Sequence, residues 1–391
     1  MLKDFSLQAM VMGLLAAFVG FASSFAVVLH GFSGVGATTA EAASGLMALS
    51  VAMGLCGIVL SLATRMPVSV AWSTPGAALI ATSGGLSGGF SEAVGAFLVC
   101  GSLMVVAGLF RPLGRIVASI PAPLANAMLA GVLLALCFAP VKAIAFDPVL
   151  GLPIVLTWVI VGAMKRLYAV PAALLAFALV ILFGVPMPDG AFASWTASLM
   201  LHPMFIMPVL TWAGLVSVAL PLFIVTMASQ NIPGIAVLKV NGYEPKPGPL
   251  FTATGIFTLL SAPFGAHAVN LAAITAALCA GEDAHRDPAR RYWASLVAGI
   301  AYVVLGLLAG AVISFVTLAP PILIEAVAGL ALMGAFSGAA FAAFKEVETR
   351  EAAAITFIVT ASGVSFLGVS GAFWGLLAGG VVMGLGKVLT S

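Results

Sequence analysis

Four polar side chains lie inside long apolar stretches of this chain and are of types that could do chemistry. His267 could exchange a proton, because the pKa of an unperturbed imidazole is about 6.5, or it could be a neutral, hydrogen-bonded histidine that fixes the backbone. Asn270, about one helical turn later, could bind a carboxylate oxygen or bridge two helices. Ser229 and Gln230 belong to a dense polar run, 226–234, and we expect them to contact a bound molecule.

Glu325 is a further ionisable residue in an apolar segment. It lies about one turn into the segment 320–344, so it could carry a proton or stabilise the start of that helix. His30 and Glu41 lie toward a loop, and we expect them to be solvated. The sequence contains no P-loop, no H-E-x-x-H, no haem or iron–sulfur spacing and no nucleophile elbow, so no motif predicts an enzyme or a cofactor.

The elements that must position these residues are membrane-spanning helices. Hydrophobic residues make up 62% of the 391 residues and charged residues only 7%, whereas a soluble domain has about 25% charged residues. A spanning helix needs about 20 apolar residues, and the uncharged runs predict about fourteen crossings in one integral membrane unit, 1–391. The runs are 5–40, 42–64, 66–91, 93–110, 116–141, 148–164, 167–188, 206–230, 247–281 counted twice, 292–316, 320–344, 350–367 and 371–387.

Positive charge predicts the orientation of these crossings, because Lys and Arg in short loops are retained on the cytoplasmic side. With the N-terminus inside, Lys142 alone among the fifteen Lys and Arg residues falls outside. We therefore expect both termini in the cytoplasm. The stretch 247–281 must then cross twice, with a break at 261–265, because a single crossing would export Arg286 and its basic neighbours.

Two crossings are predicted to be discontinuous, at corresponding positions of the two halves. Residues 67–79 begin extended and then meet Pro75-Gly76 before a helical run, so we predict Thr74 as the N-cap and Pro75 as the first helical residue. Residues 264–271 are also short and broken. Two halves with an odd number of crossings each are inverted repeats, and paired broken helices in such repeats point to a substrate site for an anionic group. Simple kinks in packed helices are the alternative.

Three segments carry a resemblance that extends over the whole chain. Ser73-Thr74-Pro75-Gly76, the run 227–231 and the run 264–270 are similar to those of the BenE-type benzoate:proton symporters. The resemblance implies an all-α polytopic fold with seven plus seven crossings as an inverted repeat, shared with the uracil and nucleobase–ascorbate transporters. It also implies that crossings three and ten each consist of a short strand and a half-helix.

That fold has a core domain that faces a gate domain. The resemblance places the core at 1–112 and 206–316, and the gate at 116–188 and 318–391. It places the substrate between them, beside short antiparallel strands, and the gate could support a homodimer. The strands would be Val70–Ser73 and Phe264–His267.

The chain departs from the nucleobase transporters at the residues that would meet the substrate. Acidic residues that hydrogen-bond the base in those transporters are replaced here by Ser229, Gln230, His267 and Asn270. A site without acidic groups suits a carboxylate, which an acidic site would repel. The expected function is therefore proton-coupled import of benzoate or a close aromatic carboxylate across the bacterial inner membrane, by alternating access. A nucleobase or heterocycle:proton symporter and a passive anion channel are the alternatives.

The predicted site places the carboxylate between Thr74–Gly76 and Ala268–Asn270, with its ring against aromatic side chains. The predicted substrate-binding residues are Phe25, Trp72, Ser73, Thr74, Gly76, Ser229, Gln230, Phe264, His267 and Asn270. The predicted proton-coupling residues are His267 and Glu325, and neither a metal nor a cofactor is expected.

Overall fold

The structure is a computed structural model of the chain. The structure describes residues 6–22, 24–83, 86–110, 121–186, 203–272, 274–364, 366 and 371–390. It is almost entirely helical, as the apolar runs predict, and its one short sheet in the described residues has two strands.

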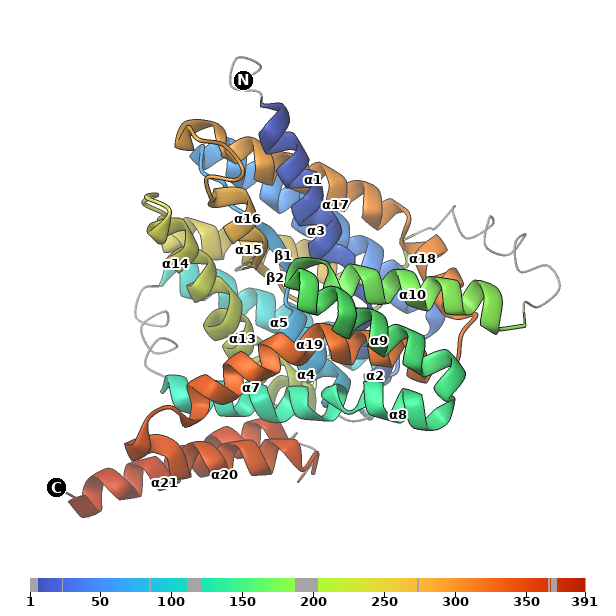
Figure 1. Ribbon diagram of the computed structural model, residues 1–391. Helices are drawn as coiled ribbons and strands as arrows, with labels where there is room; N and C mark the ends of the chain where they lie inside the picture. The colour runs from blue at the N-terminus through green and yellow to red at the C-terminus, as the bar shows by residue number, and fades with distance from the viewer. Residues whose placement is uncertain are drawn as a thin grey trace.

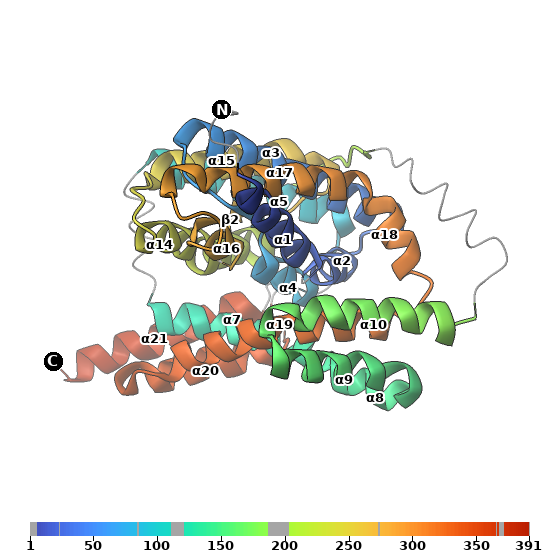
Figure 2. The ribbon, with the colours of Figure 1, turned by 45° about the horizontal axis from the view of Figure 1, so that its top comes forward.

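The helices form two layers, which Figure 2 shows one above the other. The first layer contains α1 (Leu7–Ala22), α2 (Phe25–Gly34), α3 (Thr39–Thr64), α4 (Thr74–Thr82), α5 (Gly89–Leu109), the segment from α12 to α14 (Trp212–Gly214 to Ile232–Val240), α15 (Pro247–Ser261), α16 (Ile274–Ala280), α17 (Tyr292–Leu307) and α18 (Ala309–Val316). The second layer contains α7 (Ala122–Cys137), α8 (Ala139–Phe146), α9 (Pro148–Met164), α10 (Ala169–Gly184), α19 (Pro321–Phe344), α20 (Arg350–Ala361) and α21 (Gly371–Thr390). The transport roles of core and gate stay predictions for these layers.

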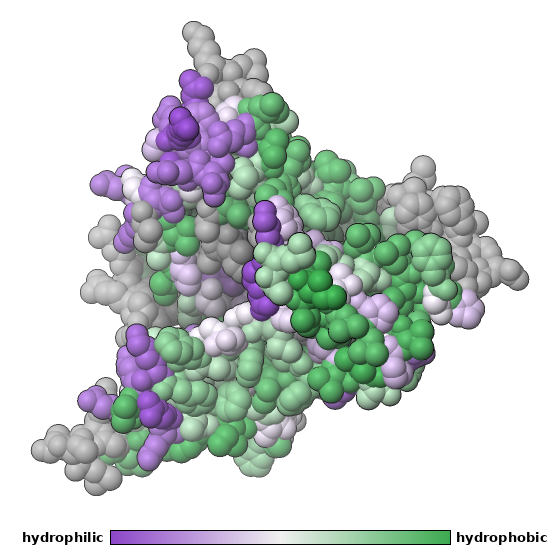
Figure 3. Space-filling model, in the orientation of Figure 1, coloured by the Kyte–Doolittle hydropathy of each residue, from purple (hydrophilic) through white to green (hydrophobic). Residues whose placement is uncertain are grey.

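The outer surface of the helices is apolar. Large hydrophobic side chains are exposed on many of them, such as Phe183, which is 85% exposed. Figure 3 shows hydrophobic residues over most of one face, while most hydrophilic residues gather along its left side. A surface of this kind is stable in contact with lipid and not with water.

Length and composition alone identify six helices in the described residues that could cross a membrane, or seven when the bent pair Pro288–Leu307 and Ala309–Val316 counts as one span. The shorter apolar helices α9, α10 and α21 accompany them. The prediction of fourteen crossings stays a prediction. The predicted break inside 247–281 is confirmed, because α15 ends at Ser261 and a 3₁₀ turn, η5 (Ala262–Phe264), follows it.

The two broken segments meet as a short antiparallel ribbon at the centre of the first layer (Figure 1). Strand β1 (Val70–Trp72) pairs with β2 (Val269–Leu271), with Ala71 opposite Asn270. The predicted first strand, Val70–Ser73, is correct to within one residue. The predicted second strand, Phe264–His267, is wrong, because Pro263 lies in the 3₁₀ turn and Gly265 then takes a left-handed φ of 92°.

Side chains satisfy the outer edge of this ribbon. The Val269 N–H donates to Thr258 Oγ1 at 3.0 Å, and the Leu271 N–H donates to Asn231 Oδ1 at 2.9 Å. Backbone groups without a partner are costly within a membrane, where water does not replace a missing partner. These two hydrogen bonds therefore make a two-stranded ribbon possible at this depth.

Candidate functional site

The N-terminus of α4 is the centre of the candidate site. Its N-cap is Ser73, whose Oγ accepts a hydrogen bond from the Gly76 N–H at 3.1 Å, so the predicted cap at Thr74 is wrong by one residue. Thr74 is instead the first helical residue, and Pro75 has no N–H to cap. Of the first three residues of α4, Pro75 has no N–H and the Gly76 N–H is bound to the serine cap. The Thr74 N–H is therefore the one backbone donor left among them.

Two other segments hold Ser73 in place. Thr226 Oγ1 of α13 (Leu220–Thr226) donates to Ser73 Oγ at 2.9 Å, and the Ser73 N–H donates to Ala268 O at 3.0 Å. Ser73 and Thr226 are both fully buried, whereas Thr74 is half-buried. Ser73 thus fixes the start of α4 against the polar run and the second broken segment, and the half-buried Thr74 lies beside it.

Trp72 forms the aromatic wall next to this cap. Its Nε1–H donates to Ser24 Oγ at 2.8 Å, and Ser24 Oγ–H in turn donates to Gly20 O at 2.8 Å. The Trp72 ring packs on Phe21, with centroids 5.2 Å apart, and Phe21 stacks on Phe25 at 5.7 Å. The junction of α1 and α2 therefore positions the ring of Trp72.

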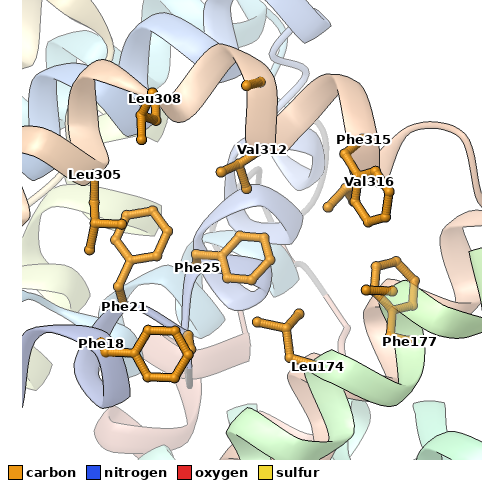
Figure 4. Close-up of a pocket in the computed structure, with 13 residues that line it drawn as sticks. Phe18, Phe21, Phe25, Leu174, Phe177, Leu305, Leu308, Val312, Phe315 and Val316 are labelled. Atoms are coloured by element: carbon orange, nitrogen blue, oxygen red, sulfur yellow. The ribbon is translucent and has the colours of Figure 1, made fainter. Parts of the chain in front are cut away.

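Phe25 connects this wall to an apolar pocket between the two layers. The pocket has a volume of about 490 Å³ and is lined by residues of α1, α2, α10, α17 and α18. Figure 4 shows Phe25 of the first layer and Phe177 of α10 at this pocket. Its lining is apolar throughout, so it can receive a hydrocarbon group and offers no partner to a carboxylate.

The polar run 226–234 contains a π-helical turn, η4 (Met227–Asn231). Such turns occur frequently at functional sites. Ser229 and Gln230 are half-buried and lie one turn beyond Thr226, and Ser229 Oγ–H donates to Val225 O at 2.6 Å. Thr226, one turn earlier in the same run, contacts Ser73. Asn231 is fully buried and faces β2.

His267 lies between two phenylalanine rings. Its ring is 5.8 Å from that of Phe32 and 6.3 Å from that of Phe97, it is fully buried, and neither ring nitrogen has a hydrogen-bond partner among the described residues. Asn270 is also fully buried: its Nδ2–H donates to Leu271 O at 2.7 Å, and its Oδ1 has no partner in the described part of the chain.

Phe264 lies at a different place from Trp72. It contacts Phe205, with ring centroids 6.2 Å apart, and lines a second pocket of about 460 Å³ beside α3 and α15. Its carbonyl oxygen accepts a hydrogen bond from Ser44 Oγ–H at 3.0 Å. The structure therefore gathers Trp72, Ser73, Thr74 and Gly76, but it separates Phe264 from them.

Glu325 has a partner that the sequence did not predict. Its Oε1 is 3.6 Å from Nδ1 of His30 on α2, and the two side chains are 31% and 27% exposed. The expectation that His30 is merely solvated is wrong, because α2 packs against α19 at this point. No three His, Cys, Asp or Glu side chains among the described residues gather closely enough to hold a metal ion.

Comparison with known proteins decides the family. The family model described as "BenE: Benzoate membrane transport protein" matches residues 3–385. This chain belongs to the BenE family. It is therefore a membrane transport protein and not an enzyme.

Two relatives align with this BenE-family chain over nearly its whole length. It is 41% identical to "Inner membrane protein YdcO" of Escherichia coli (strain K12) over 372 residues, which covers 94% of this chain and 93% of that protein. It is 32% identical to "Benzoate membrane transport protein" of Acinetobacter baylyi over 382 residues, which covers 96% of this chain and 94% of that protein.

Solved structures share the fold at low sequence identity. SLC26A9 matches with a TM-score of 0.63 and 13% identity, over 100% of this chain and 66% of that chain. The transmembrane domain of the cyanobacterial bicarbonate transporter BicA matches with a TM-score of 0.55 and 15% identity, over 98% of this chain and 97% of that chain. The predicted transporter fold is confirmed by these matches.

Three residues of the candidate site were not singled out from the sequence: Ser24, Thr226 and Asn231. Thr226 lies directly before the π-helical turn η4 and Asn231 is the last residue of that turn, and each binds a different broken segment. The sequence did show that this polar run needs hydrogen-bond partners, because it lies in an apolar helix. It did not show which of its side chains bind the backbone or side chains of other segments.

Proposed function

We propose that this protein imports benzoate or a related aromatic carboxylate together with protons, by alternating access between the two helix layers. The support from relatives is family membership and the 32% identity to a protein named as a benzoate membrane transport protein. A relative is named as an inner membrane protein, and positive charge in the loops favours cytoplasmic termini in a bacterial inner membrane.

The observation that carries the proposal is the cap of α4 beside Trp72. Ser73, Thr226 and Ala268 O fix the start of α4 at a point where aromatic and neutral polar side chains meet. No acidic side chain takes part in these contacts, so a carboxylate there meets donors and no like charge. We assign Thr74, with Ser229 and Gln230, to the carboxylate, and Ser73 to the positioning of Thr74.

The aromatic ring of the substrate belongs against Trp72 and Phe25. Edge-to-face and offset contacts of aromatic rings contribute about 0.5–1.5 kcal/mol beyond the area they bury. The apolar pocket that Phe25 shares with Phe177 lies beside this position (Figure 4), so a ring there stays in contact with apolar side chains of both layers.

Alternating access assigns the first layer to the moving core and the second layer to the gate, with a homodimer formed through the gate. His267 and Glu325 are the candidate proton carriers. If His267 carries the proton, His267→Gln retains uptake of the substrate but loses its dependence on a pH gradient.

The test is uptake of labelled benzoate into proteoliposomes, with and without an inward acid gradient, at equal membrane potential. Saturable uptake that rises with the gradient and is inhibited by substituted benzoates is expected. Inhibition by uracil in place of substituted benzoates would assign a heterocycle as the substrate, and non-saturating currents without dependence on the gradient would indicate a channel.

A matched pair of threonines tests the site itself. Thr74→Val removes the half-buried hydroxyl at the start of α4, and it is expected to raise the KM for benzoate about fivefold or more, which corresponds to the loss of about 1 kcal/mol. Thr64→Val is the control, because Thr64 Oγ1 donates to Leu60 O at 2.7 Å and accepts from the Met66 N–H at 3.2 Å, and both partners lie at the end of α3. Equal KM values in the two variants would remove Thr74 from the site.

A further inference from the structure

The contact between His30 and Glu325 joins the two layers. His30 lies near the middle of α2 in the first layer, and Glu325 lies in the second turn of α19 in the second layer. Their nearest atoms, His30 Nδ1 and Glu325 Oε1, are 3.6 Å apart, which is an ion-pair distance and longer than a hydrogen bond. In the topology predicted from the loop charges, both residues lie toward the periplasmic ends of their helices.

His30 is fixed to the first layer by close packing of α2 on α4. A Cβ added to Gly31 would lie 2.7 Å from Ala77 O, and one added to Gly34 would lie 2.7 Å from Ala81 O. Only glycine allows the two backbones to approach this closely. Because α4 is in turn capped by Ser73, His30 moves with the broken segment that forms the candidate site.

Glu325 is fixed to the second layer in a similar way. A Cβ added to Gly329, one turn later on α19, would lie 2.8 Å from Pro140 Cδ of α8. The Cys137 thiol of α7 lies 4.0 Å from Gly329 O. The ion pair therefore connects two closely packed units, and it must break if the layers separate at this edge.

No other charged group among the described elements that pack on α2 competes for His30. The helices α1 and α4 have no titratable side chains. On α3, Glu41 is engaged by Thr38, whose N–H and Oγ–H both donate to Glu41 Oε2 at 2.8 Å. On α19, Glu325 is the one charged residue.

The elements that pack on α19 bring few charges toward Glu325. The helices α9 and α10 have none, and α7 has only the buried thiol of Cys137. On α8, Lys142 is exposed. Asp147, which directly follows α8, is the N-cap of α9. The charged residues of α20 lie at the opposite end of α19, where Arg350 Nε–H donates to Phe344 O. His30 is thus the partner of Glu325.

We propose that the pair of His30 and Glu325 is a proton-responsive latch that holds the periplasmic edges of the two layers together during the transport cycle. This inference rests on the proposed alternating access. The latch attracts when the His30 imidazole carries a proton and Glu325 is ionised. When the proton leaves His30, or when one binds Glu325, the charge attraction is lost and this edge opens more often.

The size of the effect follows from the partial exposure of both side chains. A partly exposed ion pair changes an equilibrium by only about twofold to fivefold, since exposed pairs are worth up to about 1 kcal/mol and about 1.4 kcal/mol is tenfold. The latch therefore biases the opening of the edge, and it leaves the edge free to open and close in each cycle.

Thiol labelling measures this opening without any substrate. Ala26 lies one turn before His30 on the same face of α2 and is 3% exposed, so a cysteine at this position is shielded while the edge is closed. The four native cysteines are buried and give little background. Ser33→Cys on the same helix is the control, because Ser33 is exposed: its labelling follows the pH dependence of the thiol reaction itself and is expected to be independent of the latch.

The variants have opposite expected effects. In Ala26→Cys protein, the rate of labelling by a membrane-impermeant maleimide, relative to that of Ser33→Cys, is expected to be about twofold to fivefold higher at about pH 8.5 than at about pH 6, either side of the ordinary histidine pKa. Each rate is normalised to Ser33→Cys at the same pH. His30→Gln and Glu325→Gln are expected to be fast at both pH values, and His30→Lys, a permanent cation, is expected to be slow at both. The exchanged pair His30→Glu with Glu325→Lys is expected to restore slow labelling.

The outcomes separate the latch from the transport proposal. Equal labelling in wild type, His30→Gln and His30→Lys would overturn the latch, even if benzoate uptake is saturable and coupled to the gradient. If labelling follows the expected order while benzoate is not transported, the latch stands and the substrate is wrong. If Glu325→Gln does not fold, the comparison of His30→Gln with His30→Lys still tests the latch.

Discussion

Asn231→Leu is the substitution whose effect follows most directly from the structure. Asn231 is fully buried, and its Oδ1 accepts the Leu271 N–H at 2.9 Å on the outer edge of β2. Leucine has about the same size but no acceptor, so the Leu271 N–H is left without a partner inside the membrane. An orphaned buried donor costs about 1–3 kcal/mol, which is about a fivefold to 150-fold change in the folding equilibrium. Because β2 also holds Ala268 O against Ser73, we expect the KM for benzoate to rise as well.

The assay compares denaturant unfolding in detergent and uptake in proteoliposomes for Asn231→Leu and for Asn241→Leu. Asn241 lies just past the end of the same helical segment, and its Nδ2–H donates to Val237 O at 2.9 Å within that segment, so its loss affects no strand. A decrease in stability and a rise in KM for Asn231→Leu alone is the expected result. If both variants unfold and transport like the wild type, Asn231 does not support β2 and the description of the ribbon edge is wrong.

Other contacts of the α4 cap give further predictions. Thr226→Val is expected to lose about 0.5–1.5 kcal/mol of stability and to raise KM, whereas Thr226→Ser, which keeps the hydroxyl that donates to Ser73, stays close to wild type in both assays. In the double variant with Asn231→Leu, the two losses are expected not to add, with a coupling of about 0.5 kcal/mol or more in a double-mutant cycle, because both side chains hold one ribbon. Gly76→Ala places a Cβ 2.7 Å from Ser73 Oγ and against Leu222, so it is expected to cost about 1–3 kcal/mol, with partial recovery in combination with Leu222→Val.

Local patterns in the sequence were sufficient to predict the class of fold. Apolar runs of spanning length and the scarcity of charge predict a helical membrane protein, and proline and glycine predicted the broken segments at 67–79 and 261–271. The bounds of the first strand, which the family resemblance implied, were correct to within one residue, and β-branched residues precede Pro75-Gly76 there. The apolar runs and the breaks in them depend on residues that are close together in the chain, so they can be read from the sequence.

Predictions failed where the outcome depends on residues far away in the chain. Both Ser73 and Thr74 are good N-caps, and the hydrogen bonds from Thr226 and to Ala268 favour Ser73. The second strand lies at Val269–Leu271 and not at the predicted Phe264–His267. At Val269–Leu271 the side chains of Thr258 and Asn231 accept hydrogen bonds from its N–H groups. His30 was expected to be solvated because it lies toward a loop, and its partner, Glu325, is about three quarters of the chain away.

The same long-range contacts indicate where movement can occur. Thr226 and Asn231 bind the two broken segments from one helical run, and glycines bring α2 into backbone contact with α4, so these elements form one closely connected unit. A unit with so many buried hydrogen bonds does not open internally at low cost. The contact between α2 and α19, by contrast, includes a partly exposed ion pair whose strength depends on protons. Movement that responds to protons is therefore expected between the two layers and not within the site, which is the arrangement that alternating access requires.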